Sequence, residues 1–278
     1  MRIGLVILPH EPWAVARERW KAAEDLGFHH AWTYDHLTWR GFRDRSWFGA
    51  IPILTAAATL TSRIRLGTLV ATPNFRHPVP LAKEVMTLDD ISGGRLTLGL
   101  GAGATGFDAS ALGEPPWSPR ERADRFGEFV ELLDRLLVER ATSARGRFYS
   151  AEEARSIPGC VQQPRVPFAL AATGPRGLRL AARLGQSWVA VDRRGVDRAL
   201  VDRLEEACAE VGRDPGSLDR IALLGLRERP LDSIQAFRDV VGHYRELGFT
   251  DLVVHWPEGP FTGSPALFET IAAEGWLA

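Results

Sequence analysis

The stretch that decides the fold runs from Arg65 to Gly106 and reads RLGTLVATPNFRHPVPLAKEVMTLDDISGGRLTLGLGAGATG. Two short apolar runs within it, Arg65–Val70 and Leu96–Leu100, are typical of buried strands. Between them, Pro78–Ile91 has apolar residues at helical spacing. Two such strands joined by a helix form a βαβ unit. Each strand ends in a loop of small or polar residues, where a ligand can approach the backbone closely.

The same alternation of strands and helices extends along the whole chain. The other expected strands are Arg2–Leu8, His30–Tyr34, Pro167–Ala171, Ser187–Val191, Ile221–Leu224 and Asp251–His255. The other expected helices are Pro12–Leu26, Gly49–Thr61, Arg120–Glu139, Arg176–Leu184, Val196–Val211, Ile234–Leu247 and Pro265–Ala273. Eight strand–helix units without a linker-like stretch predict an α/β protein, a (β/α)8 TIM barrel forming a single domain over residues 1–278. An open doubly wound sheet is the alternative.

Two segments interrupt the alternation, Ala102–Pro119 and Ala141–Pro167, and both are rich in glycine, proline or polar residues. We expect them to be irregular insertions around the fourth helix. The active site of such a barrel lies at the carboxyl ends of its strands. Candidate site residues are therefore expected in the loops that follow the strands.

Composition limits the class of protein. Apolar residues make up 45% of the chain and charged residues 25%, which is ordinary for a soluble globular enzyme. A formal net charge of -1 gives no reason to expect nucleic acid or a membrane surface as a partner. The two cysteines are too few for a disulfide framework, no metal site is expected, and no apolar run reaches the length of a membrane span. The first residues fit a strand better than a signal peptide, and the expected compartment is the cytoplasm.

The segment Gly101–Gly106 matches the dinucleotide-binding pattern G-x-G-x-x-G. That pattern normally follows the first strand and opens a helix, whereas here it follows the fourth strand and precedes a segment with three prolines. A Rossmann interpretation is therefore disfavoured. The glycines are expected to let a ring system lie flat against the backbone.

Several linked motifs resemble those of the bacterial luciferase-like monooxygenase family, in the branch that uses the deazaflavin coenzyme F420. They lie mostly at strand ends and cover most of the chain: Tyr34-Asp35-His36, Leu66-Gly67-Thr68 with Thr72-Pro73 and Arg76-His77-Pro78, Ser92-Gly93-Gly94-Arg95-Leu96, Leu98-Gly99-Leu100-Gly101-Ala102-Gly103, Ala172-Thr173-Gly174-Pro175-Arg176 and Ala181-Ala182-Arg183-Leu184-Gly185. Each motif alone is weak, but their order and spacing together are fairly specific.

The resemblance implies which residues hold the cofactor. A non-proline cis peptide that backs the ring would fall at Leu69–Val70. Asp35 and Thr72 match positions that touch the deazaflavin ring or its tail. Ala102 and Gly103 match backbone positions that pass beside the cofactor. The phosphate-binding turn matches Thr173, Gly174, Arg176 and Gly177, where free N–H groups at a helix start suit an anion.

The resemblance also places His36 near the reactive C5 of the deazaflavin, where an imidazole can hold the substrate's proton as hydride moves. The alternative is a histidine that orders its loop through Asp35 or a backbone carbonyl. Trp39, His10 and Trp256 are expected to form walls of the substrate pocket, although a core position is an alternative for Trp39. Ala104 stands where sugar-phosphate dehydrogenases of the family carry an acidic residue, which argues against oxidation of a sugar phosphate.

Three functions follow from these expectations. The first is an F420-dependent oxidoreductase that passes hydride between deazaflavin C5 and a small organic substrate. The second is an FMNH2-dependent monooxygenase, which needs a flavin reductase as partner. The third is a barrel that binds FMN or another flavin without catalysis. The resemblance further implies a homodimer and a possible flavin or F420 reductase partner.

Overall fold

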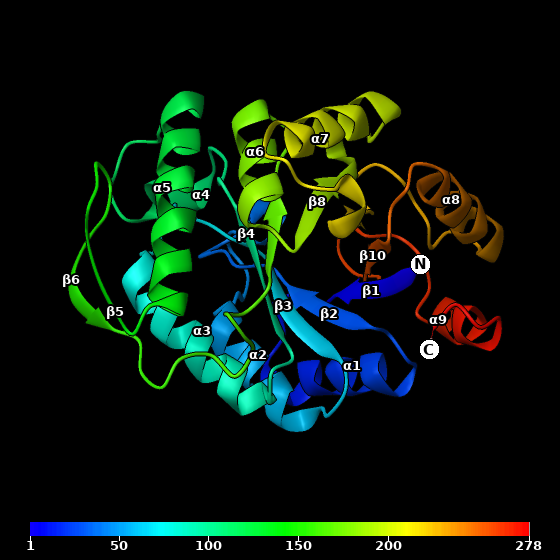
Figure 1. Cartoon of the computed structure of the whole chain (residues 1–278). Helices are drawn as coiled ribbons and strands as arrows, with labels where there is room; N and C mark the ends of the chain where they lie inside the picture. Colours follow the sequence, from blue (N-terminus) through cyan, green and yellow to red (C-terminus); the bar gives the residue numbers. More distant parts are fainter. Residues whose placement is uncertain (278) are drawn as a thin grey trace.

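Eight parallel strands close into a barrel in the order β1-β10-β9-β8-β7-β4-β3-β2 (Figure 1). The computed structural model describes residues 1–277 and every side chain among them except that of Arg194. The barrel strands are β1 (Arg2–Val6), β2 (His30–Thr33), β3 (Arg65–Ala71), β4 (Leu96–Gly101), β7 (Phe168–Ala171), β8 (Ser187–Val191), β9 (Asp219–Leu223) and β10 (Asp251–His255). The predicted (β/α)8 barrel is confirmed, and the open doubly wound sheet is excluded because β10 pairs with β1.

Helices follow the barrel strands and form its outer layer. They are α1 (Trp13–Asp25), α2 (Ala50–Leu60), α3 (Pro78–Ser92), α4 (Phe107–Ala111), α5 (Pro119–Val138), α6 (Pro175–Leu184), α7 (Arg198–Glu210), α8 (Ile234–Glu246) and α9 (Ala266–Ala273). Each of the eight predicted helices is present within a few residues of its expected bounds. Proline at the first turn of α3, α5 and α6 starts these helices where no backbone N–H is needed.

Both predicted irregular segments contain regular structure. The five-residue helix α4 lies in the first, and the antiparallel hairpin of β5 (Ala141–Arg145) and β6 (Ser150–Arg155) lies in the second. Figure 1 shows this hairpin beside α5 and outside the barrel. The expectation of fully irregular insertions was wrong because mostly exposed, polar strands carry no apolar alternation.

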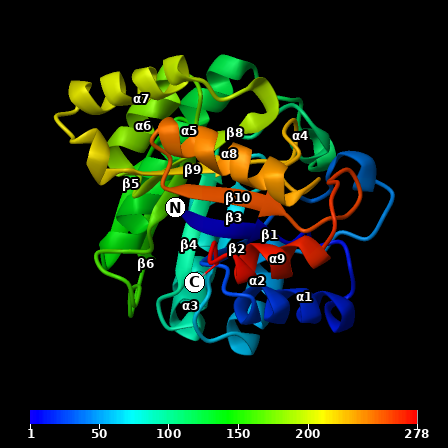
Figure 2. The same ribbon diagram turned by 90° about the vertical axis from the view of Figure 1, so that its right-hand side faces the viewer.

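Apolar side chains form two layers, one inside the barrel and one between strands and helices. The inner layer takes alternate strand residues such as Val6, Trp32, Leu69, Val189 and Val253. The outer layer contains the largest fully buried side chains that face helices, among them Trp20, Phe129, Phe168 and Trp188. Figure 2 shows β10 and β1 side by side between their neighbouring helices. Within residues 1–277, no helix is both long and apolar enough to cross a membrane.

Candidate functional site

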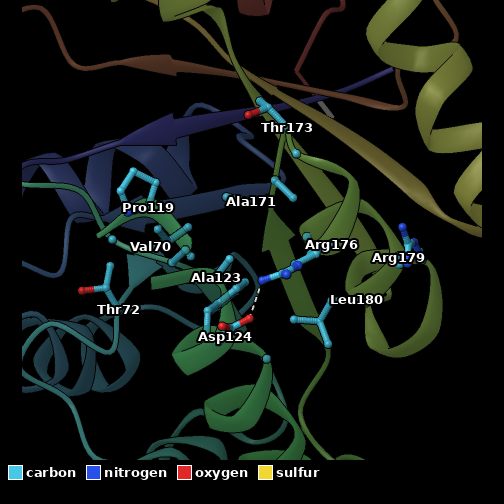
Figure 3. A pocket seen from close by; sticks show the side chains of 18 of the residues that line it. Val70, Thr72, Pro119, Ala123, Asp124, Ala171, Thr173, Arg176, Arg179 and Leu180 are labelled. Carbon is cyan, nitrogen blue, oxygen red and sulfur yellow. Dashed lines mark hydrogen bonds and ion pairs between the residues drawn. The ribbon is translucent and has the colours of Figure 1, made fainter. Parts of the chain in front are cut away.

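A cavity of about 1230 Å³ opens at the carboxyl ends of the strands and extends outward between α5 and α6. This volume exceeds that of a typical drug-sized pocket, so the cavity has room for a large cofactor. Nine of the predicted site residues line it: His36, Val70, Thr72, Ala102, Gly103, Thr173, Gly174, Arg176 and Gly177. Figure 3 shows Val70 and Thr72 on one side of the cavity and Thr173 and Arg176 on another.

The inner wall of the cavity is formed by a bulge at the end of β3. The pairing with β4 shifts between Thr68 and Ala71, so that one extra residue is inserted on β3. The peptide bond between Leu69 and Val70 within this bulge is cis, as the resemblance implies. Leu69 is buried in the barrel interior, whereas Val70 lines the cavity.

The glycines of the fourth strand and its loop fit the protein's own neighbouring side chains. A Cβ at Gly101 would lie 2.6 Å from Val70 Cγ2, closer than real Cβ atoms approach another atom. Gly103 has φ of +71°, and its Cβ would lie 2.7 Å from the Asn74 Oδ1 atom. The β3 bulge therefore requires glycine at position 101, and the loop after β3 requires it at position 103. This packing requirement adds to the expected close approach of a ring system.

The turn between β7 and α6 presents the start of a helix to the cavity. Gly174 is the N-cap of α6 and has no side chain to accept a hydrogen bond from the first turn. The first backbone N–H groups of a helix lack partners within the helix and carry its positive dipole end. This turn can therefore bind an anion such as a phosphate.

Four arginines line the outer part of the cavity: Arg120, Arg176, Arg179 and Arg183. Arg176 is paired with Asp124 of α5, as Figure 3 shows. Arg183 is 2.5 Å from the Glu131 carboxylate, and Arg179 is 3.0 Å from that of Glu210. All of these pairs are at least partly exposed, so an incoming anion can exchange for a carboxylate at little cost.

His36 lies at the inner end of the cavity, beyond β2. Its Nδ1 contacts Oδ2 of Asp108, a residue of α4 that is 72 positions away in the sequence and 4% exposed. The ring lies edge-on to Tyr34 and tilted against Trp47. The alternative interpretation named Asp35 or a backbone carbonyl as the partner of His36; the partner is Asp108 instead.

Asp35 is outside the set of described residues that line the cavity. It is 1% exposed, and its two oxygens accept hydrogen bonds of 2.9 and 2.7 Å from Arg76. Burial lowers the pKa of Arg76, but the bonds and charge of Asp35 outweigh burial and raise that pKa. The described contacts of Asp35 thus fix the loop after β3, which contributes Thr72 to the cavity.

The three residues predicted to form substrate-pocket walls lie elsewhere among the described residues. Trp39 is 8% exposed and stacks on Phe261, with ring centroids 6.0 Å apart. Trp256 packs against Phe268 of α9 on the outer layer. Trp39 thus occupies the core position that was its alternative. A role of Trp39, Trp256 and His10 as walls of a substrate pocket stays a prediction.

His10 lies away from the cavity, in a cluster with Glu11 and Glu258. Burial raises the pKa of Glu258, against the lowering effect of Arg19 and His10. One nitrogen or oxygen atom from each of the three side chains lies within 4.8 Å of the others, a spacing that suits a metal ion. Arg19, however, contacts Glu258 and lies 2.8 Å from Glu11, so a guanidinium already occupies the position of a cation.

Sequence reasoning missed Asp108 and the acidic partners of the arginines. Asp108 lies five positions beyond Gly103, in a segment that the sequence predicts to be irregular. The short helix α4 returns the chain toward β2 and brings this carboxylate to His36. The available signal was a lone acid at a helix start, which is too common to identify a site.

A (β/α)8 barrel with a large cavity at the carboxyl ends of its strands and an uncapped helix start facing that cavity has the architecture of the TIM-barrel proteins. The family model described as luciferase-like monooxygenase matches residues 1–230. The chain belongs to this family.

Curated relatives include an F420-dependent glucose-6-phosphate dehydrogenase from Beutenbergia cavernae, 35% identical over 71% of this chain and 59% of its own length. A second relative is an F420-dependent hydroxymycolic acid dehydrogenase from Mycobacterium tuberculosis, 32% identical over 79% of this chain and 61% of its own length. This chain thus spans about three fifths of the length of these relatives.

Solved structures share the fold. The coenzyme F420-dependent tetrahydromethanopterin reductase of Methanopyrus kandleri superimposes with a TM-score of 0.78 at 21% identity, covering 98% of this chain and 97% of that one. A monooxygenase from Streptomyces bottropensis superimposes with a TM-score of 0.73 at 23% identity, covering 100% of this chain and 97% of that one. At these identities the structures demonstrate the shared barrel only.

Proposed function

We propose that the protein is an F420-dependent oxidoreductase that acts on a small organic substrate. One observation carries this proposal: a single cavity connects His36 with the open N-terminus of α6 and with four arginines. F420 combines a flat ring, a phosphate and an acidic tail, and the three parts of the cavity match these in order. The names of the F420-dependent relatives support the same cofactor.

The residues present fit this cofactor. The Val70 bulge and the backbone of Ala102 and Gly103 would lie against the ring, and the uncapped turn at Gly174 would hold the phosphate. Arg176 and its neighbours would meet the carboxylates of the tail, because arginine binds carboxylates in bidentate fashion. When bound, F420 supplies a carbon that accepts or gives hydride.

His36 is the side chain we assign to the substrate's proton. It lines the cavity and presents an imidazole, which changes charge near neutral pH more readily than other side chains do. Ala104 also lines the cavity and offers no carboxylate at the position expected for an acid. We therefore propose a substrate other than a sugar phosphate, such as an alcohol or carbonyl compound.

Titration of the protein with F420 and, separately, with FMN tests the cofactor, with tryptophan fluorescence as the signal. We expect an F420 dissociation constant on the order of micromolar and weaker binding of FMN. Arg176→Ala should weaken F420 binding about tenfold, the effect of losing one charge-assisted hydrogen bond. Arg238→Ala is the matched control, because Arg238 of α8 pairs with Glu274, the C-cap of α9, and neither residue lines the cavity. Failure to bind either cofactor contradicts the proposal.

An FMNH2-dependent monooxygenase is the second candidate, favoured by the shared barrel of the Streptomyces bottropensis enzyme. It would bind FMN more tightly than F420 and would require a flavin reductase. A barrel without catalysis is tested by His36→Ala, which should keep cofactor binding and lose turnover. Equal turnover of this variant would remove His36 from the reaction. The homodimer, the reductase partner and the cytoplasmic location stay predictions.

A further inference from the structure

We propose that Asp108 is the positioning residue for His36, and that the pair works as a carboxylate–imidazole dyad at the inner end of the cavity. This inference rests on the proposed function for its chemistry, but its geometry is independent of the cofactor. Ala104 offers no carboxylate to the site, whereas Asp108 of α4, four positions later in the sequence, does.

Both oxygens of the Asp108 carboxylate are engaged. Oδ1 accepts hydrogen bonds of 2.8 Å from the Leu37 N–H and 3.3 Å from the Thr38 N–H. Oδ2 contacts His36 Nδ1. One buried carboxylate therefore anchors the backbone of the loop after β2 and also orients the imidazole of the same loop.

This arrangement selects one tautomer of His36. An ionised carboxylate only accepts hydrogen bonds, so Nδ1 must carry the proton that is shared with Asp108. Nε2 is then the nitrogen with a free lone pair, and it is the ring nitrogen left for a ligand in the cavity. The carboxylate also stabilises the positive charge that forms when Nε2 takes up a proton.

The dyad provides the proton half of an alcohol–carbonyl conversion. In the oxidising direction, oxidised F420 held against Val70 and the backbone of Ala102 and Gly103 would supply the acceptor for the hydride that the alcohol C–H bond loses. The O–H bond breaks as the C=O bond forms, and its proton goes to Nε2 of His36. In the reducing direction the same proton returns from Nε2 to the substrate oxygen.

Asp108→Asn is the discriminating variant, since it is isosteric and keeps one oxygen for Leu37 and Thr38. The amide then presents its NH2 group to Nδ1, which must become an acceptor and so move the ring proton to Nε2. Long-range 1H–15N NMR of histidine-labelled protein reads this tautomer, with the His36 signals assigned by their loss in His36→Gln. We expect the Nδ1–H form in the parent and the Nε2–H form in the variant. An Nε2–H parent, or an unchanged tautomer in the variant, overturns the proposal.

Asp192→Asn is the matched control. Asp192 is a fully buried carboxylate whose oxygens accept from Gly225, Leu226, Arg227 and Glu228 N–H, so it anchors a loop without touching a histidine. The Asp192→Asn substitution should lower Tm and leave the His36 tautomer unchanged.

Kinetics give a second test, with a substrate found in a screen of alcohols and carbonyl compounds. Asp108→Asn should lower kcat about 10²-fold while KM and F420 binding stay unchanged, and Asp108→Glu should recover part of the lost kcat. Loss of F420 binding in the parent would defeat the proposed function but not the tautomer result.

Discussion

At the scale of single residues, Gly103 is constrained by both its own conformation and its neighbour. Gly103→Ala places a Cβ at φ of +71° and 2.7 Å from Asn74 Oδ1. We expect a loss of about 1–3 kcal/mol in the free energy of unfolding and weaker cofactor binding, because this loop lines the cavity. Urea unfolding and the F420 titration measure the two effects. Gly106→Ala is the control, since a Cβ at Gly106 meets nothing within 4 Å. Equal losses in both variants would contradict this account.

The site residues also show how far the position of a single residue can be predicted from the sequence. The family resemblance singled out His36, Thr72 and Arg176, and all three line the cavity. Barrel geometry alone predicted only that site residues lie in the loops after the strands. Trp39 and His10 follow strands as well, but Trp39 stacks on Phe261 and His10 pairs with Glu258, and neither lines the cavity. The position of a loop residue can be predicted from the strand before it, whereas the direction of its side chain depends on tertiary contacts.

At the scale of elements, Glu24 of α1 connects this helix to the turn before β3. Its carboxylate accepts hydrogen bonds from the N–H groups of Ser62, Arg63 and Ile64. Burial raises the pKa of Glu24, but these bonds outweigh burial and lower the pKa to about 2 from an ordinary value of 4.5. Because the folded pKa is the lower one, the stabilisation is complete above pH 4.5 and is lost as pH falls toward 2.

Glu24→Gln should therefore reduce stability by about 1 kcal/mol at pH 7, after allowance for screening of a largely solvated group. The difference from the parent should vanish as pH falls toward 2. Thermal unfolding across this pH range measures it. Asp25→Asn is the neighbouring control, because Asp25 is exposed and pairs only with Lys21 among the described contacts. A pH-independent difference between Glu24→Gln and the parent would refute the assigned cause.

The elements differed in how far the sequence could predict them. The barrel strands and their helices were predictable because buried parallel strands are continuous apolar runs and the helices have apolar stripes. The β5–β6 hairpin was not, since its residues are largely polar and exposed. Helix α4 is only five residues long and lies among glycines and prolines, so no helical period in the sequence indicates it.

At the scale of the whole molecule, Asp251 joins the first and last barrel strands at the bottom of the barrel. It is 2% exposed, receives two hydrogen bonds from Arg2 and lies 3.0 Å from His30 Nε2. Burial raises the pKa of Asp251, but the hydrogen bonds from His30 and Arg2 outweigh burial and lower it below the ordinary 3.8. This contribution to stability is present above pH 3.8 and is lost as pH falls below that value.

Asp251→Asn should lower the free energy of unfolding by about 2–4 kcal/mol at neutral pH, because the buried His30 and the partly exposed Arg2 lose their charged acceptor. Guanidinium unfolding should show one transition with a lower midpoint and an unchanged slope, since strand closure affects the whole barrel. Asp219→Asn is the control: Asp219 also contacts Arg2, but its side chain is 43% exposed. An equal loss in both variants would argue against a special role for the buried carboxylate.

The fit of Val70 into the space beside Gly101 also limits how this sequence can diverge. Any side chain at position 101 would collide with Val70 Cγ2, so a substitution there is tolerable only with a smaller residue at position 70. The two positions should therefore co-vary among close homologues, with glycine at 101 wherever position 70 is branched. A larger residue at position 101 alone would displace Val70, which lines the cavity, so the shape of the cavity wall depends on both positions together.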